Sequence, residues 1–295
     1  MYPIYDIIFC ISILTYNYQL GYIMKKLLYQ MLLSCLLILS VNQIGLCSEF
    51  RFVQVTDLHL KPNQSSCENF NKIINNINNT KNVKFVVFTG DNTDRADRDD
   101  YVRFLSMANH LKVPYYVVVG NHDVFKMGGF SREDFVTVVR KYNKNQKTQK
   151  TNFLIKQGDI IFIVLDGARE AIPSPGGYYR DETLAWLNKK LKKYNKKQVV
   201  MLQHFPMKLR DLEHSAYKNE RYEEILAKNN NVIGIFAGHY HANEEYIKDG
   251  IFYSITGRAS GPDAGYKIVD MIEEKNPETN KKSYVFYTQF IPVNN

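Results

Sequence analysis

Residues 83–94 read VKFVVFTGDNTD, an almost continuous apolar run that ends abruptly in a glycine and two nearby carboxylates. A short run of this kind, without apolar–polar alternation, is typical of a strand that is covered on both faces. Five other runs have the same character and are also expected to be buried strands: FRFVQVT at 50–56, PYYVVVG at 114–120, IIFIVLDG at 160–167, QVVMLQH at 198–204 and VIGIFAG at 232–238.

Amphipathic segments separate several of these runs. Apolar residues recur at helical spacing in residues 68–79, 99–110, 131–142 and 181–194. Two later runs, at 251–257 and 283–290, indicate further strands. The alternation of strands and helices predicts an α/β fold. Because the chain has no internal repeat and no linker rich in proline or serine, we expect one domain, with the Lys/Asn-rich tract 141–150 as an exposed loop.

The composition excludes several classes of protein. The chain has 295 residues, of which 45% are hydrophobic and 23% are charged, as in an ordinary globular protein and unlike a disordered, collagen-like or coiled-coil chain. Four cysteines are too few for a scaffold held by many disulfides. The net charge of +8 suits anionic partners such as nucleic acid, phosphate esters or lipid head groups. A codon bias toward lysine and asparagine would explain it equally well.

The first 47 residues differ from the rest of the chain. Met24 and two lysines precede the apolar run LLYQMLLSCLLILSV, which has the length of the hydrophobic region of a secretory signal. We therefore expect residues 1–47 to be an upstream extension and an export signal that starts at Met24, and residues 48–295 to be the functional domain. The expected location is periplasmic or secreted. An uncleaved membrane anchor and a lipidated Cys47 are the alternatives.

Polar side chains follow five of the six buried runs, at the point where each run ends. These segments are DLH at 57–59, GDNTD at 90–94, GNHD at 120–123, QHFP at 203–206 and GHYH at 238–241. In open α/β sheets, ligands bind outside the carboxyl ends of the strands, so the five segments are expected to converge. Five of the seven histidines of the chain fall in them. Histidine and aspartate suit Zn, Fe or Mn, which predicts a metal site.

In this order, the five segments resemble the calcineurin-like metallophosphoesterase superfamily, over residues 50 to about 270. The segment GYY…LAWL at 177–187 is similar to the branch of class III cyclic-nucleotide phosphodiesterases, which often has a histidine where this chain has Gln203. The resemblance implies a four-layer α/β/β/α sandwich, in which two mixed β-sheets are flanked by helices. It also implies a dinuclear metal centre at the strand ends.

The same resemblance gives the candidate ligands of two divalent or trivalent ions, either Fe, Mn or Zn. Three residues would hold the first ion, a fourth would bridge both ions and three more would complete the second: Asp57, His59 and His241; Asp91; and Asn121, His204 and His239. Two such ions clamp the attacking and leaving oxygens and lower the pKa of a bound water toward about 7. The implied activity is hydrolysis of phosphate diesters or monoesters by direct attack of a metal-bound hydroxide.

His122 lies between candidate ligands but is not expected to bind metal. The resemblance implies that it stabilises the transition state or protonates the leaving alkoxide, and that Asp94 is its orienting carboxylate. Capping of a helix or turn is the alternative role for Asp94. Asp123 is expected to shape its loop, and the loop 168–178, rich in glycine and proline, to shape access of the substrate.

The expected partner is a small anionic phosphate ester, and the oligomeric state is left open. A nuclease of the same superfamily is the second interpretation, but a solvated helix face explains the lysine pairs between residues 189 and 197 better than a nucleic-acid surface does. A membrane is expected to be a partner only through an uncleaved N-terminal segment. A non-catalytic binding protein on the same scaffold is the third interpretation. Such a protein would be expected to have lost ligands, and none is missing here.

Overall fold

The computed structural model describes residues 50–207, 214, 216, 217, 219–275 and 282–293. The chain divides into two compact units, residues 1–47 and 48–295. The export segment expected at residues 1–47 lies outside the described residues. Within the described residues, no helix combines the length and the apolar character needed to cross a membrane.

Five strands form the first sheet, in the order β11-β10-β1-β2-β3. The parallel part consists of β1 (Phe50–Val55), β2 (Val83–Phe88) and β3 (Tyr115–Val117). The antiparallel part is the long hairpin of β10 (Gly265–Lys275) and β11 (Lys282–Pro292). The sheet is therefore mixed, and the carboxyl ends of its three parallel strands lie at one edge.

Six strands form the second sheet, in the order β4-β5-β6-β7-β9-β8. Its parallel centre consists of β5 (Ile160–Leu165), β6 (Gln198–Gln203), β7 (Val232–Ala237) and β9 (Ile251–Ile255). The edge strands β4 (Phe153–Gln157) and β8 (Glu244–Lys248) are antiparallel to their neighbours. This sheet is also mixed, with a parallel centre like that of the first.

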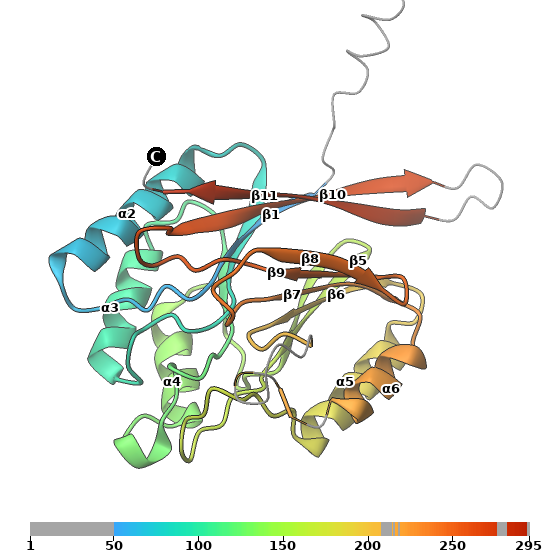
Figure 1. The fold of residues 1–295 in the computed structure, drawn as a ribbon, viewed down its shortest axis with the longest axis horizontal. Helices are drawn as coiled ribbons and strands as arrows, with labels where there is room; N and C mark the ends of the chain where they lie inside the picture. Colours follow the sequence, from blue (N-terminus) through green and yellow to red (C-terminus); the bar gives the residue numbers. More distant parts are fainter. Residues whose placement is uncertain (1–49, 208–213, 215, 218, 276–281, 294–295) are drawn as a thin grey trace, which may run out of the picture. The chain divides into compact units, whose positions relative to one another are not determined.

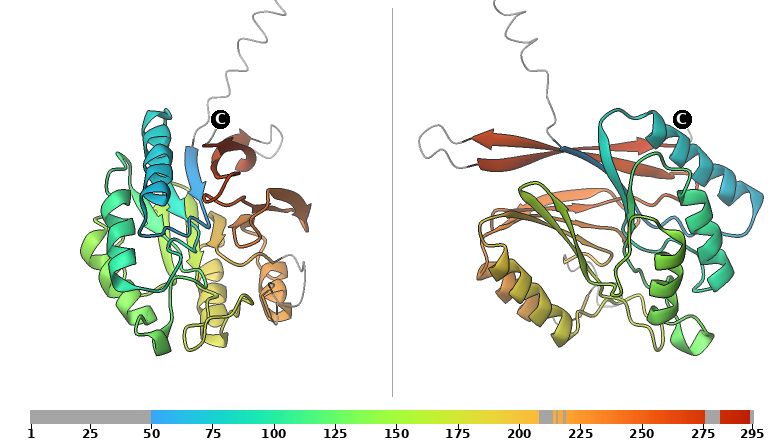
Figure 2. Two further views of the ribbon diagram at one scale, coloured as in Figure 1. Left: turned by 60° about the vertical axis from the view of Figure 1, so that its left-hand side comes forward. Right: turned by 180° about the vertical axis from the view of Figure 1, so that it is seen from behind.

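Helices cover the outer faces of both sheets (Figures 1 and 2). On the first sheet lie α2 (Gln64–Asn79), α3 (Arg98–Ala108) and α4 (Arg132–Tyr142), the last preceded by the short 3-10 helix η1 (Lys126–Gly128). On the second sheet lie α5 (Asp181–Lys193) and α6 (Glu220–Ala227). Side chains just before α2, α3 and α4 accept hydrogen bonds from their first-turn amides, and at α4 Ser131 and Asp134 form a capping box.

Aromatic side chains fill the space between the two sheets. The ring of Phe52 on β1 lies 5.5 Å from that of Phe162 on β5 and 5.2 Å from that of Phe236 on β7. All three side chains are fully buried. A second core packs the helices against the outer faces. Both cores are built by residues of the 48–295 unit, so this unit has what it needs to fold on its own.

The four-layer sandwich of two mixed sheets and flanking helices confirms the predicted fold. The eight predicted strands and four predicted helices are all present, although β3 covers only Tyr115–Val117 of the predicted 114–120. The tract 141–150 is not simply an exposed loop as predicted, because Asn143 and Gln146 are buried. The Gln146 side chain accepts a hydrogen bond from the Val117 amide and donates one to the Val117 carbonyl, so it takes the place of a neighbouring strand beside β3.

Candidate metal centre

The loops that follow five strands meet at the carboxyl ends of both sheets. In the first sheet, the Asp57 amide donates to the Gly90 carbonyl at 3.0 Å and the His59 amide to the Asp91 carbonyl at 2.9 Å. In the second sheet, the Gly238 amide donates to the His204 carbonyl at 3.0 Å. The predicted convergence of segments that are distant in sequence is therefore present.

Gln54 joins the two sheets directly beneath these loops. Its side-chain amide donates to the Ala237 carbonyl on β7 at 3.0 Å, and its side-chain oxygen accepts from the Thr256 hydroxyl at 2.7 Å. Gln54 is fully buried on β1, where a polar side chain needs partners of this kind. Gln54 is not among the residues predicted from the sequence, although a glutamine inside an apolar strand is the signal for such a contact between sheets.

Three groups of potential metal ligands lie at this junction, each with its ligand atoms within 4.8 Å of one another. The groups are Asp57, His59 and His241; His59, Asp91 and His122; and Asp91, His204 and His239. Asn121 joins the third group, because its side-chain oxygen lies 3.1 Å from Nε2 of His204. The structure thus gathers all seven predicted ligands around two positions, with Asp91 between them.

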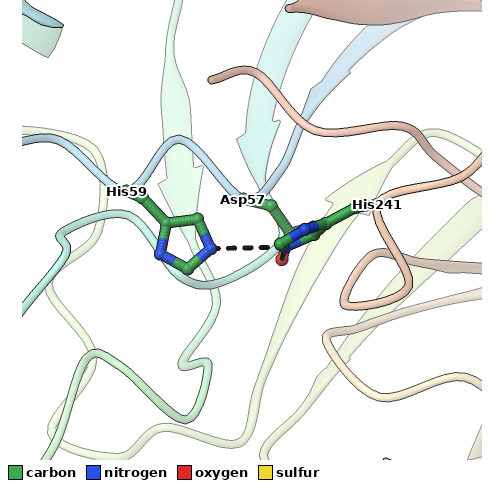
Figure 3. Close-up of side chains that lie close together, drawn as sticks. All are labelled: Asp57, His59 and His241. Carbon is green, nitrogen blue, oxygen red and sulfur yellow. Dashed lines mark hydrogen bonds and ion pairs between the residues drawn. The ribbon is translucent and has the colours of Figure 1, made fainter. Parts of the chain in front are cut away.

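Ligand atoms in these groups lie close together, and one of them has no hydrogen-bond partner. Figure 3 shows the imidazole rings of His59 and His241 with their Nε2 atoms facing each other, at 3.3 Å. Oδ1 of Asp57 is buried without any hydrogen-bond partner, and it lies 3.4 Å from Nε2 of His241. A buried, unpartnered carboxylate oxygen is costly, and a cation at this position would satisfy it. These residues therefore fit a divalent or trivalent metal ion.

Backbone carbonyls set the orientation of two of the histidines. Nδ1 of His204 lies 2.9 Å from the Thr89 carbonyl, and Nε2 of His239 lies 2.9 Å from the His214 carbonyl. Because a carbonyl only accepts, the facing ring nitrogen carries a proton and the other nitrogen is the one that can bind a metal. Burial lowers the pKa of His204, but the charge of Asp91 and its hydrogen bond outweigh burial and raise the pKa to about 9, so a metal would have to displace the proton on Nε2. No role could be predicted for His214 from the sequence, because it contributes its backbone carbonyl, a group that every residue has.

Burial and mutual charge shift the pKa values of the site. Burial lowers the pKa of the His59 imidazole, and burial together with the His204 charge lowers that of His239 to about 4. Both rings are therefore neutral at pH 7, as metal ligands must be. Burial raises the pKa of the Asp91 carboxyl, but the charge of His204 and its hydrogen bond outweigh burial and leave the pKa lowered. Asp91 is thus available as a carboxylate.

The backbone is strained where the candidate ligands lie. Seven non-glycine residues among those described have positive φ, and five of them are candidate ligands. They are Asp57 (51°), His59 (42°), Asp91 (51°), His239 (71°) and His241 (52°). This conformation costs roughly 1–3 kcal/mol per residue and persists only where surrounding structure enforces it. Its concentration here indicates that the positions of these side chains are functionally constrained.

Two glycines allow the backbone segments to approach the site closely. A Cβ atom on Gly120 would lie 2.2 Å from Oδ1 of Asp91, and one on Gly238 would lie 2.5 Å from Oδ2 of Asp57. No side chain fits at these distances. At the glycines before Asn121 and His239, the backbone therefore approaches carboxylate oxygens of candidate ligands.

His122 is held by Asp94, but not through the carboxylate that the sequence predicted. Nδ1 of His122 lies 2.9 Å from the backbone carbonyl of Asp94. The Asp94 carboxylate instead lies 3.6 Å from the Lys61 amine. The His122 amide donates to Oδ1 of Asp91 at 2.9 Å, so the residue is anchored to the candidate bridging carboxylate. Its Nδ1 then carries the proton, and Nε2 is the nitrogen left for chemistry.

Asp123 shapes its loop as expected. Its buried carboxylate accepts hydrogen bonds from the amide of Gly120 at 2.8 Å and from the amide and side chain of Asn92, both at 2.9 Å. Burial and the nearby charge of Asp91 raise the pKa of Asp123 to about 7. The residue ties the loop after β3 to the loop after β2, and so fixes the distance between Asn121 and Asp91.

A cleft opens beside His122. Its volume is about 490 Å³, and its walls come from the loops after β2, β3 and β5. The residues are Asp94, Arg95, Ala96, Asn121, His122, Phe125, Pro173, Ser174 and Pro175. Three of them belong to the loop 168–178. This agrees with the expected role of that loop in substrate access.

Asp166 anchors this loop. Its buried carboxylate accepts from the Ala168 amide at 2.9 Å, from Nε of Arg132 at 2.6 Å and from the Thr151 hydroxyl at 2.7 Å. The Arg180 guanidinium lies 3.5 Å from the same carboxylate oxygen as Arg132. Sequence reasoning missed Asp166, although it precedes a glycine at the end of β5 in the same way that the other polar segments follow their strands.

Comparison with solved structures agrees with the fold. A dimetal phosphatase from Danio rerio matches with a TM-score of 0.66 and 14% identity, over 83% of this chain and 96% of the other. GAP50 of Plasmodium, an anchor in the inner membrane complex, matches with a TM-score of 0.56 and 14% identity, over 82% and 88%. At these identities the likeness concerns the fold alone.

Comparison with known sequences identifies relatives and a family. The chain is 31% identical over 148 residues to the Arcobacter nitrofigilis protein named "Probable glycerophosphodiester phosphodiesterase GpdQ", and 27% identical over 145 residues to the uncharacterized protein YvnB of Bacillus subtilis. Each match covers 48% of this chain, but only 51% and 11% of the respective relative. Residues 50–243 match the family model of the calcineurin-like phosphoesterases. The chain therefore belongs to the calcineurin-like phosphoesterase family, as its five polar segments predicted.

Proposed function

We propose that residues 48–295 form a dinuclear-metal-dependent phosphoester hydrolase that acts on small phosphate diesters. The observation that carries this proposal is the shared position of Asp91. Its Oδ2 lies 3.4 Å from Nε2 of His204 and 3.8 Å from Nε2 of His59, so one carboxylate borders both groups of candidate ligands. A carboxylate placed in this way can bridge two ions.

Two ions bound there would supply Lewis-acid activation of the phosphate and of a water at neutral pH. The side chains of the chain supply the rest. Asn121 contributes a neutral oxygen and adds no negative charge where a phosphate must bind. His122 is exposed beside the cleft, with Nδ1–H held by the Asp94 carbonyl, and it lies next to His59 and Asp91. When protonated, Nε2 can donate its proton to the leaving oxygen.

Diesters are the preferred substrate class for two reasons. The cleft beside His122, at about 490 Å³, leaves room for a second ester group beyond the scissile phosphate. The relative with 31% identity carries the name of a glycerophosphodiester phosphodiesterase. The narrower resemblance to class III cyclic-nucleotide phosphodiesterases, and the export of the domain by residues 1–47, are part of the same proposal.

A substrate panel with two variants tests the proposal. The metal-loaded protein is assayed with bis-aryl phosphate, aryl phosphate, cyclic and linear nucleotides, nucleic acid and glycerophosphodiesters. We expect diesters to turn over faster than monoesters and nucleic acid, and Asp91→Asn to lose activity by at least about a thousandfold together with bound metal. His110→Gln, an exposed histidine on the surface, is the matched control and should leave activity unchanged.

The role of His122 needs its own readout. A proton donor matters most when the leaving group is a poor one, so His122→Gln should slow an alkyl diester by about 10²–10⁴-fold and an aryl diester far less. Equal losses on both substrates would contradict protonation of the leaving group. Full activity of Asp91→Asn would contradict the two-metal mechanism as a whole.

A further inference from the structure

Exposed apolar side chains lie on segments next to the walls of the catalytic cleft. Five large hydrophobic residues are exposed in the described part of the chain, and three of them lie on loops beside the cleft. Met127 is 75% exposed, Ile172 is 67% exposed and Tyr217 is 40% exposed. Single exposed apolar residues are ordinary, but a group of them on neighbouring loops marks an interaction surface.

Hydrogen bonds hold these loops together. The Lys126 amide, next to Met127, donates to the Glu170 carbonyl at 2.7 Å, which fixes the turn after β3 against the loop that carries Ile172. The Tyr217 amide donates to the Gly177 carbonyl at 2.8 Å, at the other end of that loop. The segments that carry the three exposed apolar side chains are therefore joined to one another.

The same surface is positively charged. Lys126 and Arg169 are both exposed, and within the described residues neither lies within 4.0 Å of a carboxylate. The Arg169 guanidinium stacks over the Tyr217 ring at 4.9 Å. Glu170, the acid on the same loop, is paired at 3.0 Å with the Arg132 guanidinium, which it shares with Asp166. We call Lys126, Met127, Arg169, Ile172 and Tyr217 the cleft rim.

We propose that the cleft rim docks on an anionic lipid bilayer. Met127 and Ile172 would enter the interface, Lys126 and Arg169 would lie at the level of the anionic head groups, and Tyr217 would take the interfacial position that suits an amphipathic ring. A bilayer matches this combination of separated apolar tips with cations that have no acidic partner among the described residues. Docking would bring the cleft to the membrane surface, so that lipid-borne phosphodiesters become its substrates. That last consequence rests on the proposed function, whereas docking itself does not.

Vesicle binding tests the docking. The domain starting at Ser48, which contains both cores and lacks the apolar N-terminal segment, is mixed with vesicles of phosphatidylcholine alone or with 30% phosphatidylglycerol, and bound protein is separated by flotation. We expect binding to the anionic vesicles that weakens as salt is added. The double variant Met127→Ser/Ile172→Ser should bind at least about tenfold more weakly, because two large side chains no longer enter the interface. The double variant Lys126→Ala/Arg169→Ala should lose the preference for anionic vesicles.

Ile247 provides the matched control. It is 74% exposed, as much as Met127, but it lies on the edge strand β8 of the second sheet. Ile247→Ser should bind vesicles like the unaltered domain. The proposal is overturned if the unaltered domain does not bind anionic vesicles at low salt, if Met127→Ser/Ile172→Ser binds normally, or if Ile247→Ser weakens binding equally. If the unaltered domain binds no vesicles, a protein becomes the alternative partner of the cleft rim.

An activity measurement separates this inference from the proposed function. A soluble glycerophosphodiester should be hydrolysed equally by the unaltered domain and by Met127→Ser/Ile172→Ser, whereas a diester head group held in vesicles should be hydrolysed about tenfold more slowly by the variant. If no diester is hydrolysed at all, the proposed function fails and the binding result stands alone. If both substrates are affected equally, the surface acts on the cleft and not on docking.

Discussion

Replacement of Gly120 by alanine is the sharpest perturbation of the site that leaves every candidate ligand in place. The new methyl carbon would lie 2.2 Å from Oδ1 and 2.3 Å from the amide nitrogen of Asp91. Carbon atoms essentially never approach an oxygen more closely than 3.0 Å, so the Asp91 carboxylate must move by about 0.8 Å. Displacements near 1 Å at a reacting centre cost about a hundredfold in rate.

The move also affects the neighbours of Asp91. Its Oδ1 accepts the His122 amide at 2.9 Å, so a displaced carboxylate shifts the expected proton donor as well as the metal bridge. We therefore expect kcat to fall about a hundredfold on a soluble diester, with fewer bound metal ions per chain. Overpacking of this kind costs roughly 1–3 kcal/mol of unfolding free energy.

Gly158→Ala is the control for stability. Gly158 lies in the β4–β5 turn, has a φ of 58° and leaves open space for a methyl group. Alanine there costs about 1–2 kcal/mol through its left-handed backbone, a loss like that expected for Gly120→Ala. Urea unfolding, metal analysis and diester turnover are measured on both variants. The reasoning is refuted if Gly120→Ala keeps more than about a third of the activity, or if Gly158→Ala loses as much.

Three further predictions concern stability and processing. Asp166→Asn should lower the unfolding free energy by about 1–3 kcal/mol in urea, because Arg132 and Arg180 lose a buried carboxylate while Arg132 keeps Glu170 as an acidic partner. Burial raises the pKa of Asp166, but Arg132 and Arg180 outweigh burial and leave the pKa lowered. The stabilisation by Asp166 is therefore complete above the pKa of the unfolded chain, about 3.9, and disappears as the pH falls through the lower pKa of the folded state. A difference in unfolding free energy between the variant and the unaltered protein that already shrinks between pH 7 and pH 5 would contradict this cause. Removal of metal by a chelator should lower Tm by about 5–10 °C, and added Mn or Zn should restore it. This shift corresponds to the loss of about 2.7 kcal/mol of stabilisation, the value for a metal concentration a hundred times Kd. An unchanged Tm would show that the site is empty in the purified protein or does not bind metal. Mass spectrometry of the protein from an exporting host should find an N-terminus near Cys47 or Ser48, whereas a retained segment or a lipid on Cys47 would support the alternatives.

The strands that could be predicted are those whose burial requires a continuous run of apolar residues in the sequence. β1, β2, β6 and β7 are covered on both faces, so their apolar runs stand out. β8 (EEYIK) is an exposed edge strand, and β10 (GYKIVDMIEEK) mixes charged with apolar residues, so neither gives such a run. On β10, the amine of buried Lys267 pairs with Glu245 on β8 and donates to the Ser254 hydroxyl on β9, both at 2.8 Å. A pairing between distant strands cannot be predicted from either segment alone.

The same limit applies within the site. The seven candidate ligands follow from the family resemblance, whose motifs consist of side chains that metal chemistry requires and that can be read in the sequence. The groups that orient them are the carbonyls of Thr89, Asp94 and His214, and every residue has a carbonyl. For this reason the sequence pointed to the Asp94 carboxylate, whereas the structure uses the Asp94 backbone. Only the three-dimensional structure shows which backbone carbonyl contacts which histidine ring.

The distribution of the candidate ligands over the two sheets has a physical consequence. The first sheet supplies Asp57, His59, Asp91 and Asn121, and the second supplies His204, His239 and His241. Each ion position therefore needs both sheets, as the groups around Asp57 and Asp91 show. Without metal, the junction has to hold an unpartnered carboxylate oxygen and five strained ligand backbones by packing and by the Gln54 hydrogen bonds alone. Bound metal would offset part of this cost only when the two sheets are correctly packed against each other. Metal affinity and the packing of the two sheets must therefore be coupled. A substitution between the sheets should weaken metal binding even though it changes no ligand.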